Sequence, residues 1–328
     1  MPKLAVIMTP QRVADVCSPE ARGLLDERFD VVWAGAQLDD ARVAELVSGS
    51  DVVLTGWGTP HLPASLWAGG AGPTVVAHAA GSVKKLIDPA VLDQGVAVFS
   101  AGGRIAWSVG EYCLAAMLTL ARQLPRFHAS MQNGEWKPSY LRGHEVAGRP
   151  VGILGASSTA RALITLLKPF GCDIVVYDPY LDDARAAALG VRTGSLEEAL
   201  ACPIVSIHVP NVPETVGMVS RKLIEQLPDG AIVVNSSRGP AVDQVALLEH
   251  AAQGRIAAAL DVYDPEPPAL TADELAIPNL LLSPHIAGDT TEGHLALSGY
   301  VLADVLAYLD TGARGPSFVD PASWAIAA

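Results

Sequence analysis

The sequence has few cysteines, no long apolar segment and no cluster of basic residues. Its four cysteines, Cys17, Cys113, Cys172 and Cys202, are far apart and form no CxxC pair. This pattern argues against a disulfide framework or a metal site, so we expect reduced thiols in a cytoplasmic protein and no bound metal. No apolar run approaches the roughly 20 residues that span a bilayer. The opening MPKLAVIMTP is too short for a signal-peptide core, and we expect no membrane partner.

Positive charge is also scarce. The formal net charge is −13, and a chain of that sign would be repelled by nucleic-acid phosphates, so we expect no nucleic-acid partner. Half of the 328 residues are hydrophobic and only 17% are charged, which favours a large core over disorder. The length is sufficient for two domains.

The first hundred residues alternate short β-rich apolar runs with segments of helical pattern. The candidate strands lie at 3–8, 30–35, 51–56, 74–79 and 96–101. Strands that are apolar on both faces and are joined by helices indicate a parallel sheet covered by helices on each side.

A second alternating series follows a long apolar helix expected at 107–124 and a polar segment rich in Gly and Pro. Its candidate strands lie at 151–155, 173–178, 204–209, 231–237, 256–263 and 280–285. A last long helix, expected at about 289–310, has room to return to the first series. The sequence therefore predicts two α/β domains, the second inserted between parts of the first.

The second series opens with VGILGASSTAR, a strand followed by a tight turn and the start of a helix. A dinucleotide-binding loop has three glycines at this spacing, and here the positions hold Gly155, Ser157 and Ala160. The middle position adds a Cβ where a pyrophosphate would approach. The hydroxyls of Ser157, Ser158 and Thr159 could offset it by donating to phosphate oxygens at the helix N-terminus. The alternative is an ordinary strand–turn–helix with a serine N-cap.

Asp178 favours the nucleotide hypothesis. It ends the next strand, in VVYDPY, some twenty residues after the loop, where a carboxylate accepts both ribose hydroxyls. A carboxylate there would repel a 2′-phosphate. We therefore predict NAD, with NADP disfavoured.

Three later segments carry side chains suited to acid–base chemistry at strand ends. Arg238 follows a strand in NSSRGPAVD, and its planar guanidinium can hold a carboxylate with two bonds. Asp261, Asp264 and Glu266 lie in DVYDPEPP, where a solvated acidic turn is the simpler interpretation for Asp264. His285 ends an apolar strand in LSPHIAG.

A lone histidine at a strand end is more often structural than catalytic. His78, His208 and His294 occupy comparable places without supporting neighbours in the sequence. A pairing between Arg238 and a local acid is likewise a structural alternative to substrate binding.

Together these segments resemble the D-isomer-specific 2-hydroxyacid dehydrogenases, which use NAD(P) to interconvert 2-hydroxy acids and 2-oxo acids. The ordered motifs, which extend over about residues 50–310, are GILGASSTAR with YDPY, SIHVPNVPETVGMV, LPDGAIVVNSSRGPAVD, ALDVYDPEPP and LLLSPHIAG. The resemblance implies a Rossmann NAD-binding domain at 105–287, inserted in a flavodoxin-like substrate-binding domain at 1–104 and 288–328. It also implies a homodimer, with the long helix after residue 106 at the interface.

The resemblance further implies the role of each site residue. His285 would be the acid/base, Glu266 its carboxylate partner and Arg238 the anchor of the substrate carboxylate. The implied cofactor contacts, besides those of the loop and Asp178, are His208, Pro210, Thr215, Ser236, Asp261 and Gly288.

The substrate loop is implied at Gly81 and Ser82, in HAAGSVKK. The chain departs from the family there, since KKLID stands where the family has an Asn-hydrophobic-Asp pattern.

The leading hypothesis is an NAD-dependent 2-oxo acid reductase. An imidazolium at 285 would protonate the carbonyl oxygen as hydride arrives, and a carboxylate at 266 would favour and orient that imidazolium. Which small 2-oxo acid is reduced stays open, glyoxylate and hydroxypyruvate among them. The alternative is a nucleotide-sensing corepressor or scaffold with little turnover, because such relatives can keep the same three residues.

Overall fold

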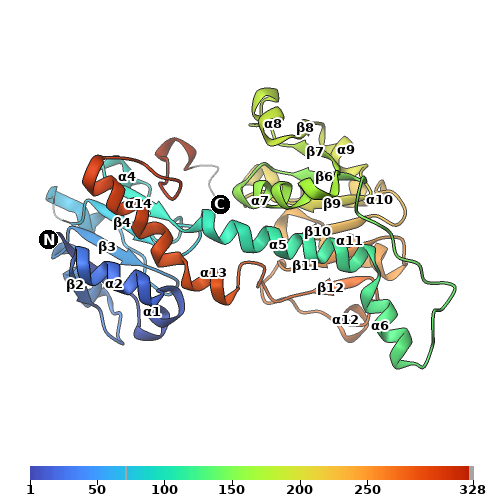
Figure 1. Ribbon diagram of the computed structural model, residues 1–328, viewed down its shortest axis with the longest axis horizontal. Helices are drawn as coiled ribbons and strands as arrows, with labels where there is room; N and C mark the ends of the chain where they lie inside the picture. The colour runs from blue at the N-terminus through green and yellow to red at the C-terminus, as the bar shows by residue number, and fades with distance from the viewer. Residues whose placement is uncertain (71, 325–328) are drawn as a thin grey trace. The chain divides into compact units, whose positions relative to one another are not determined.

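The chain folds into two compact units. The computed structural model describes residues 1–70 and 72–324. One unit contains Met1–Ile105 and the residues from Asp289 on, and the other is Ala106–Gly288 (Figure 1).

The first unit is built on a five-stranded parallel sheet of order β2-β1-β3-β4-β5. Its strands are β1 Lys3–Ile7, β2 Asp30–Trp33, β3 Val52–Thr55, β4 Val75–His78 and β5 Ala97–Ser100. Every residue of β3 and β4 is buried, as the uninterrupted apolar runs predict for strands covered on both faces.

Helices surround this sheet, and most begin at a residue whose side chain caps the first turn. They are α1 Pro10–Val16, α2 Pro19–Arg28, α3 Asp40–Ser48, α4 Ala90–Asp93, α13 Thr291–Leu295 and α14 Leu297–Thr311. Thr9, Ser18 and Asp39 each accept a hydrogen bond from the backbone amide three residues on. Two 3₁₀ segments, Ala64–Gly70 and Pro321–Ser323, complete the unit.

The prediction of one long helix at about 289–310 is wrong in one respect, because the structure has two helices there, which meet at Ala296. The carbonyl of Leu295 accepts a hydrogen bond from the amide of Ser18, at 3.2 Å, so a distant part of the chain takes a carbonyl that an unbroken helix would use itself. After the break, α14 buries Leu297 and Val301 in the same core cluster as Leu4 of the sheet.

The second unit is built on a seven-stranded parallel sheet of order β12-β11-β10-β9-β6-β7-β8. Its strands are β6 Pro150–Leu154, β7 Asp173–Tyr177, β8 Arg192–Thr193, β9 Ile204–Ile207, β10 Ile232–Asn235, β11 Ala257–Leu260 and β12 Leu280–Leu282. Six of them match the expected strands, and the two-residue β8 is too short for a periodic signal. The prediction of two α/β parallel-sheet domains is confirmed.

Two helices precede the first strand of this unit, and the others connect successive strands. They are α5 Gly102–Ala121, whose first turn precedes the division, α6 Leu124–Gln132, α7 Ser158–Leu167, α8 Asp183–Leu189, α9 Leu196–Leu200, α10 Arg221–Glu225, α11 Gln244–Ala252 and α12 Ala272–Leu275. Short 3₁₀ turns lie at Lys168–Phe170, Pro213–Thr215 and Gly239–Ala241. Within the described ranges 1–70 and 72–324, no helix is long and apolar enough to cross a membrane.

Candidate active site

The predicted site residues of the second unit follow the carboxyl ends of its strands. Gly155 follows β6, Asp178 follows β7, His208 follows β9, Arg238 follows β10 and His285 comes soon after β12. Because these strands are parallel, all five positions lie along one edge of the sheet. Strands β7 and β8 lie on one side of β6, and β9 to β12 lie on its other side, so the strand order reverses between β6 and β9. Open α/β sheets bind ligands at such a point.

The loop after β6 has the backbone that a dinucleotide loop requires at its first glycine. Gly155 has φ +90, and a Cβ there would lie 2.6 Å from the carbonyl oxygen of His208. Only glycine therefore fits the turn. Ser157 is the N-cap of α7 and its Oγ accepts from the amide of Ala160 at 3.4 Å. The other amides of this first turn have no acceptor inside the helix, as an anion site requires.

Two of the three loop hydroxyls take part in a chain of side-chain hydrogen bonds. Ser157 Oγ lies 2.9 Å from Thr159 Oγ1, which lies 2.9 Å from His208 Nδ1. His208 Nε2 lies 2.9 Å from Ser206 Oγ. Burial lowers the pKa of His208 to about 3, so the imidazole is neutral. Its buried side chain supports Thr159, and Ser158 keeps an exposed side chain. The place of His208 in the cofactor cleft stays a prediction.

Asp178, at the end of β7, is hydrogen-bonded to the loop that follows β6. Its Oδ2 accepts from the amide of Ala156 at 2.6 Å, and Oδ1 accepts from the amide of Tyr180 at 2.7 Å. The side chain is half-buried, and each oxygen retains a further lone pair. The loop, the helix N-terminus and this carboxylate therefore fit the pyrophosphate and ribose of NAD.

The remaining predicted cofactor residues shape the backbone of the same edge. Thr215 is buried, and its hydroxyl lies 2.6 Å from the carbonyl oxygen of Pro210. Ser236 Oγ lies 3.0 Å from Cys113 Sγ, whose pKa burial raises to about 11, so the thiol is neutral. Gly288 is the last residue of this unit.

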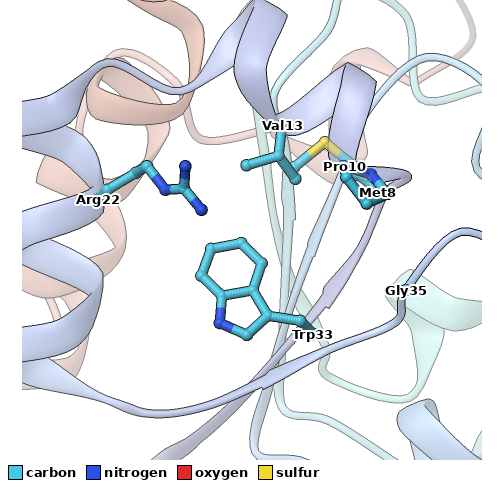
Figure 2. Close-up of a pocket in the computed structure, with 6 residues that line it drawn as sticks. All are labelled: Met8, Pro10, Val13, Arg22, Trp33 and Gly35. Atoms are coloured by element: carbon cyan, nitrogen blue, oxygen red, sulfur yellow. The ribbon is translucent and has the colours of Figure 1, made fainter.

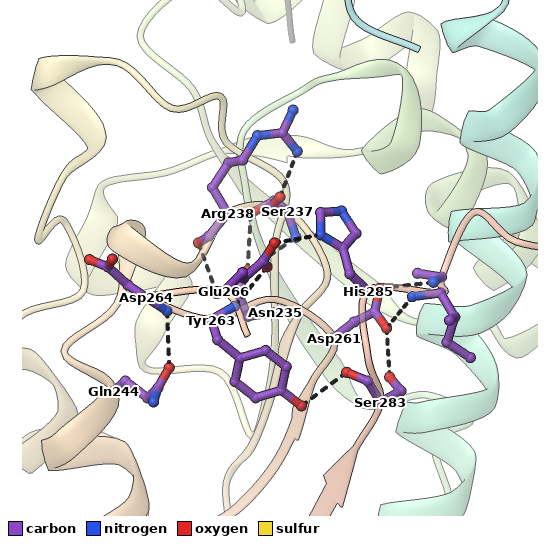
Figure 3. Close-up of polar contacts among 12 residues, drawn as sticks. Asn235, Ser237, Arg238, Gln244, Asp261, Tyr263, Asp264, Glu266, Ser283 and His285 are labelled. Atoms are coloured by element: carbon purple, nitrogen blue, oxygen red, sulfur yellow. Dashed lines mark hydrogen bonds and ion pairs between the residues drawn. The ribbon is translucent and has the colours of Figure 1, made fainter. Parts of the chain in front are cut away.

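Arg238, Glu266 and His285 lie next to one another in the structure (Figure 3). His285 Nδ1 donates to Glu266 Oε2 at 2.9 Å, and the amide of Tyr263 donates to Oε1 at 3.0 Å. Burial alone would raise the pKa of Glu266, but these hydrogen bonds outweigh it and hold the pKa below the ordinary value. Glu266 is therefore an ionised acceptor that fixes the orientation of the imidazole.

His285 presents its other ring nitrogen outward. Its side chain is 54% exposed, and Glu266 occupies Nδ1, which leaves Nε2 to meet a substrate. The residue has φ +57, in the left-handed region. A histidine at positive φ is uncommon and needs surrounding contacts to keep it there.

Arg238 is half-buried beside this pair. Burial lowers the pKa of its guanidinium and the charge of Glu266 opposes that shift. Nη1 donates to the carbonyl of Ser237 at 2.7 Å. Among residues 1–70 and 72–324, no carboxylate lies within ion-pair distance of it. The alternative of a structural ion pair therefore lacks a direct partner, and the guanidinium can receive an external carboxylate.

Asp261 holds the backbone around His285. Its side chain is fully buried, Oδ1 accepts from Ser283 Oγ at 2.6 Å and from the amide of Ile286 at 2.8 Å, and Oδ2 accepts from the amide of Ala287 at 2.8 Å. Sequence reasoning missed Ser283 because a serine before a proline at a strand end carries no signal of its own. Asp264 is exposed, in agreement with a solvated turn.

Residues 114–287 match the family model of the D-isomer specific 2-hydroxyacid dehydrogenase, NAD binding domain. The match covers more than half of the chain. This chain belongs to the D-isomer specific 2-hydroxyacid dehydrogenase family. The prediction of NAD as the cofactor is confirmed by the same match.

Several relatives within this family are named for one activity. The chain is 32% identical over 234 residues to a D-3-phosphoglycerate dehydrogenase of Archaeoglobus fulgidus, covering 71% of this chain and 44% of that protein. It is 30% identical over 282 residues to that of Mycobacterium tuberculosis, covering 85% and 53%. The chain thus spans about half the length of the curated relatives it matches.

A solved structure of similar length extends the likeness to both units. A phosphoglycerate oxidoreductase from Rhizobium etli has a TM-score of 0.82 and 25% identity, covering 97% of this chain and 98% of that one. The dehydrogenase fold is therefore present along nearly the whole chain.

The predicted substrate loop of this family member lies in the first unit. Gly81 and Ser82 follow β4, and Ser100 Oγ donates to the carbonyl of Gly81. Ser82 is exposed, and its hydroxyl accepts from the amide of Lys84 at 3.4 Å.

The first unit also holds a separate pocket, drawn in Figure 2. The guanidinium of Arg22 lies over the ring of Trp33, 5.2 Å from its centroid. The residues that line it are Met8, Pro10, Val13, Arg22, Trp33 and Gly35. None of these side chains can exchange a proton near neutral pH, so this pocket offers no acid–base group.

Proposed function

We propose that this chain is an NAD-dependent oxidoreductase that interconverts a small 2-oxo acid and a D-2-hydroxy acid. The observation that carries the proposal is the His285–Glu266 pair, with Nδ1 and Oε2 2.9 Å apart, beside the unpaired guanidinium of Arg238. An acid, its orienting carboxylate and an anchor for a second carboxylate are the groups that reduction of a 2-oxo acid requires.

Each of the three side chains has a distinct role in this reaction. Bound NADH supplies the hydride. His285 donates a proton from Nε2 to the carbonyl oxygen and stabilises the negative charge that develops there. Glu266 stabilises the imidazolium and keeps Nε2 directed outward. Arg238 holds the substrate carboxylate and fixes which face of the carbonyl is presented.

The cofactor preference is part of the proposal. Asp178 accepts two backbone amides and still has lone pairs for the ribose hydroxyls, whereas a 2′-phosphate would meet its negative charge. We therefore expect NADH to be used in preference to NADPH.

The partners and location follow the same hypothesis. A small 2-oxo or 2-hydroxy acid is the substrate, and the net charge of −13 makes a nucleic-acid partner unfavourable. The four free cysteines favour the reducing cytoplasm. The family resemblance favours a homodimer.

An NADH-oxidation screen across 2-oxo acids, repeated with NADPH, tests the proposal. The panel includes glyoxylate, hydroxypyruvate and the 2-oxo acid of D-3-phosphoglycerate, because the relatives are named for that activity. His285→Ala should lower turnover of every accepted acid by about 10²–10⁴-fold. NADH binding, measured by fluorescence titration, should remain.

Replacement of the exposed His128 by Ala is the matched control and should leave turnover unchanged. Full turnover by His285→Ala would overturn the assigned chemistry. No oxidation of NADH on any acid would favour the corepressor or scaffold hypothesis instead.

A further inference from the structure

A partly buried chain of two hydroxyl groups and a carboxylate connects helix α5 to the loop that carries His285. Tyr112 Oη lies 2.6 Å from Ser283 Oγ, and Ser283 Oγ lies 2.6 Å from Asp261 Oδ1. Figure 3 shows Ser283 and Asp261 beneath the His285 loop. All three residues belong to the second unit.

The direction of the hydrogen bonds follows from the number of protons. Ser283 has one hydroxyl proton and donates it to Asp261, so its oxygen can only accept from Tyr112. Tyr112 is therefore the donor. Burial raises the pKa of Tyr112 to about 12, so the phenol keeps this proton throughout the working pH range.

The same chain fixes the backbone on both sides of His285. On one side, the amide of Ser283 donates to Leu260 at 3.0 Å, and its carbonyl accepts from Tyr263 Oη at 2.9 Å. On the other side, the amides of Ile286 and Ala287 donate to Asp261. Every hydrogen-bonding group of Ser283 is thus used. Tyr112 is the one member of the chain from outside the strand-end loops.

We propose that Tyr112 is a positioning residue for His285 and acts through Ser283 and Asp261. Without its hydroxyl, Ser283 loses the donor that restricts its rotation, and Asp261 is held less firmly under Ile286 and Ala287. The left-handed His285 between them then samples orientations in which Nε2 is misdirected. The inference rests on the proposed function, because it assigns Tyr112 a part in that reaction.

Tyr112→Phe is the main test, since it removes only the hydroxyl. We expect kcat to fall about tenfold, because misplacement of a reacting group by less than an ångström is costly. KM for the 2-oxo acid and the NADH dissociation constant should change by less than about twofold. Tyr308→Phe is the matched control, because Tyr308 packs against Phe99 in the first unit and should leave all three constants unchanged.

A double-mutant cycle tests whether Tyr112 acts through Ser283. Ser283→Ala should lower kcat at least as much as Tyr112→Phe, and the double variant should be no slower than Ser283→Ala alone. Multiplied losses in the double variant would overturn the relay.

The imidazole NMR signals of His285, assigned by comparison with His285→Ala, give a readout that does not depend on turnover. In Tyr112→Phe we expect their chemical shifts to move, while Tyr308→Phe leaves them in place. An unchanged His285 signal together with an unchanged kcat would refute the positioning role. If the wild type reduces no 2-oxo acid, the proposed function fails, and the NMR comparison still decides whether Tyr112 controls His285.

Discussion

At the scale of single residues, the backbone of His285 matters as much as its ring. Its φ of +57 lies in a region that glycine occupies freely and that residues with a Cβ rarely adopt. The hydrogen bonds of Asp261 to Ile286 and Ala287 retain this conformation. The orientation of the His285 imidazole is therefore maintained against a local preference of the chain.

This conformation predicts a reversed order of stability for two variants that both lack the imidazole. At ordinary positions glycine is less stable than alanine, but His285→Gly should be more stable than His285→Ala by about 1 kcal/mol, because only glycine accepts positive φ without strain. Urea unfolding of the two variants measures the difference. If the alanine variant is the more stable one, the backbone at 285 carries no strain.

The sequence motifs nominate three candidate site residues but do not reveal what surrounds them. Motif order placed Arg238, Glu266 and His285 at strand ends, and the structure puts them together. The chain from Thr159 to His208 could not be predicted, because its members are 49 residues apart and meet only when β9 pairs with β6. Burial of His208 follows from that pairing and from no local pattern.

At the scale of elements, the loops after β10 and β11 touch through their backbones. A Cβ on Gly239 would lie 1.9 Å from the carbonyl oxygen of Tyr263. Gly239 follows Arg238, and the amide of Tyr263 binds Glu266. The absence of a side chain at this position is thus what lets Arg238 and the His285–Glu266 pair approach each other.

Gly239→Ala should therefore displace both loops, since neither backbone can yield without moving a site residue. We expect a loss of about 1–3 kcal/mol in the free energy of unfolding, with a greater loss of activity than partial unfolding explains. Circular dichroism melts and NADH oxidation measure the two effects.

Gly23→Ala provides the control, because Gly23 lies in helix α2 with open space around its Cβ position. The same chemical change there should stabilise the helix or be neutral. Equal behaviour of the two variants would contradict the close approach at Gly239.

Element positions were predictable where burial produces a periodic signal, and their ends were not. Helix α5 begins at Gly102 rather than at 107, and the terminal helix is interrupted because Ser18 donates to Leu295. Such interruptions depend on partners remote in sequence. The residues adjacent in sequence therefore give no signal that predicts them.

At the scale of the whole molecule, each unit contains a buried neutral histidine. His208 lies in the second unit, and His78 lies in the first, with Nδ1 2.9 Å from Thr55 Oγ1. Burial lowers the pKa of His78 from 6.5 to about 4. As the pH falls below 6.5, His78 binds a proton in the unfolded chain but not in the folded chain. The folded state therefore loses stability until the pH reaches the pKa of His78 in the folded state.

His78 should thus contribute an acid-sensitive part of the stability between pH 6.5 and about 4, amounting to about 3 kcal/mol for a shift of this size. His78→Asn removes the titrating group and should flatten the pH dependence of the unfolding free energy in this window. Urea unfolding followed by tryptophan fluorescence at several pH values gives both slopes. Identical slopes for wild type and variant would show that His78 does not titrate as its burial requires.

The core of the first unit has a consequence for the order in which the protein is made. Helix α14 supplies Leu297 and Val301 to the cluster that contains Leu4, so the sheet of the first unit lacks part of its covering until α14 has been synthesised. The second unit, complete at Gly288, has all of its strands earlier. During translation the sheet of the first unit therefore keeps apolar surface uncovered until α14 is available. The second unit can finish folding before then.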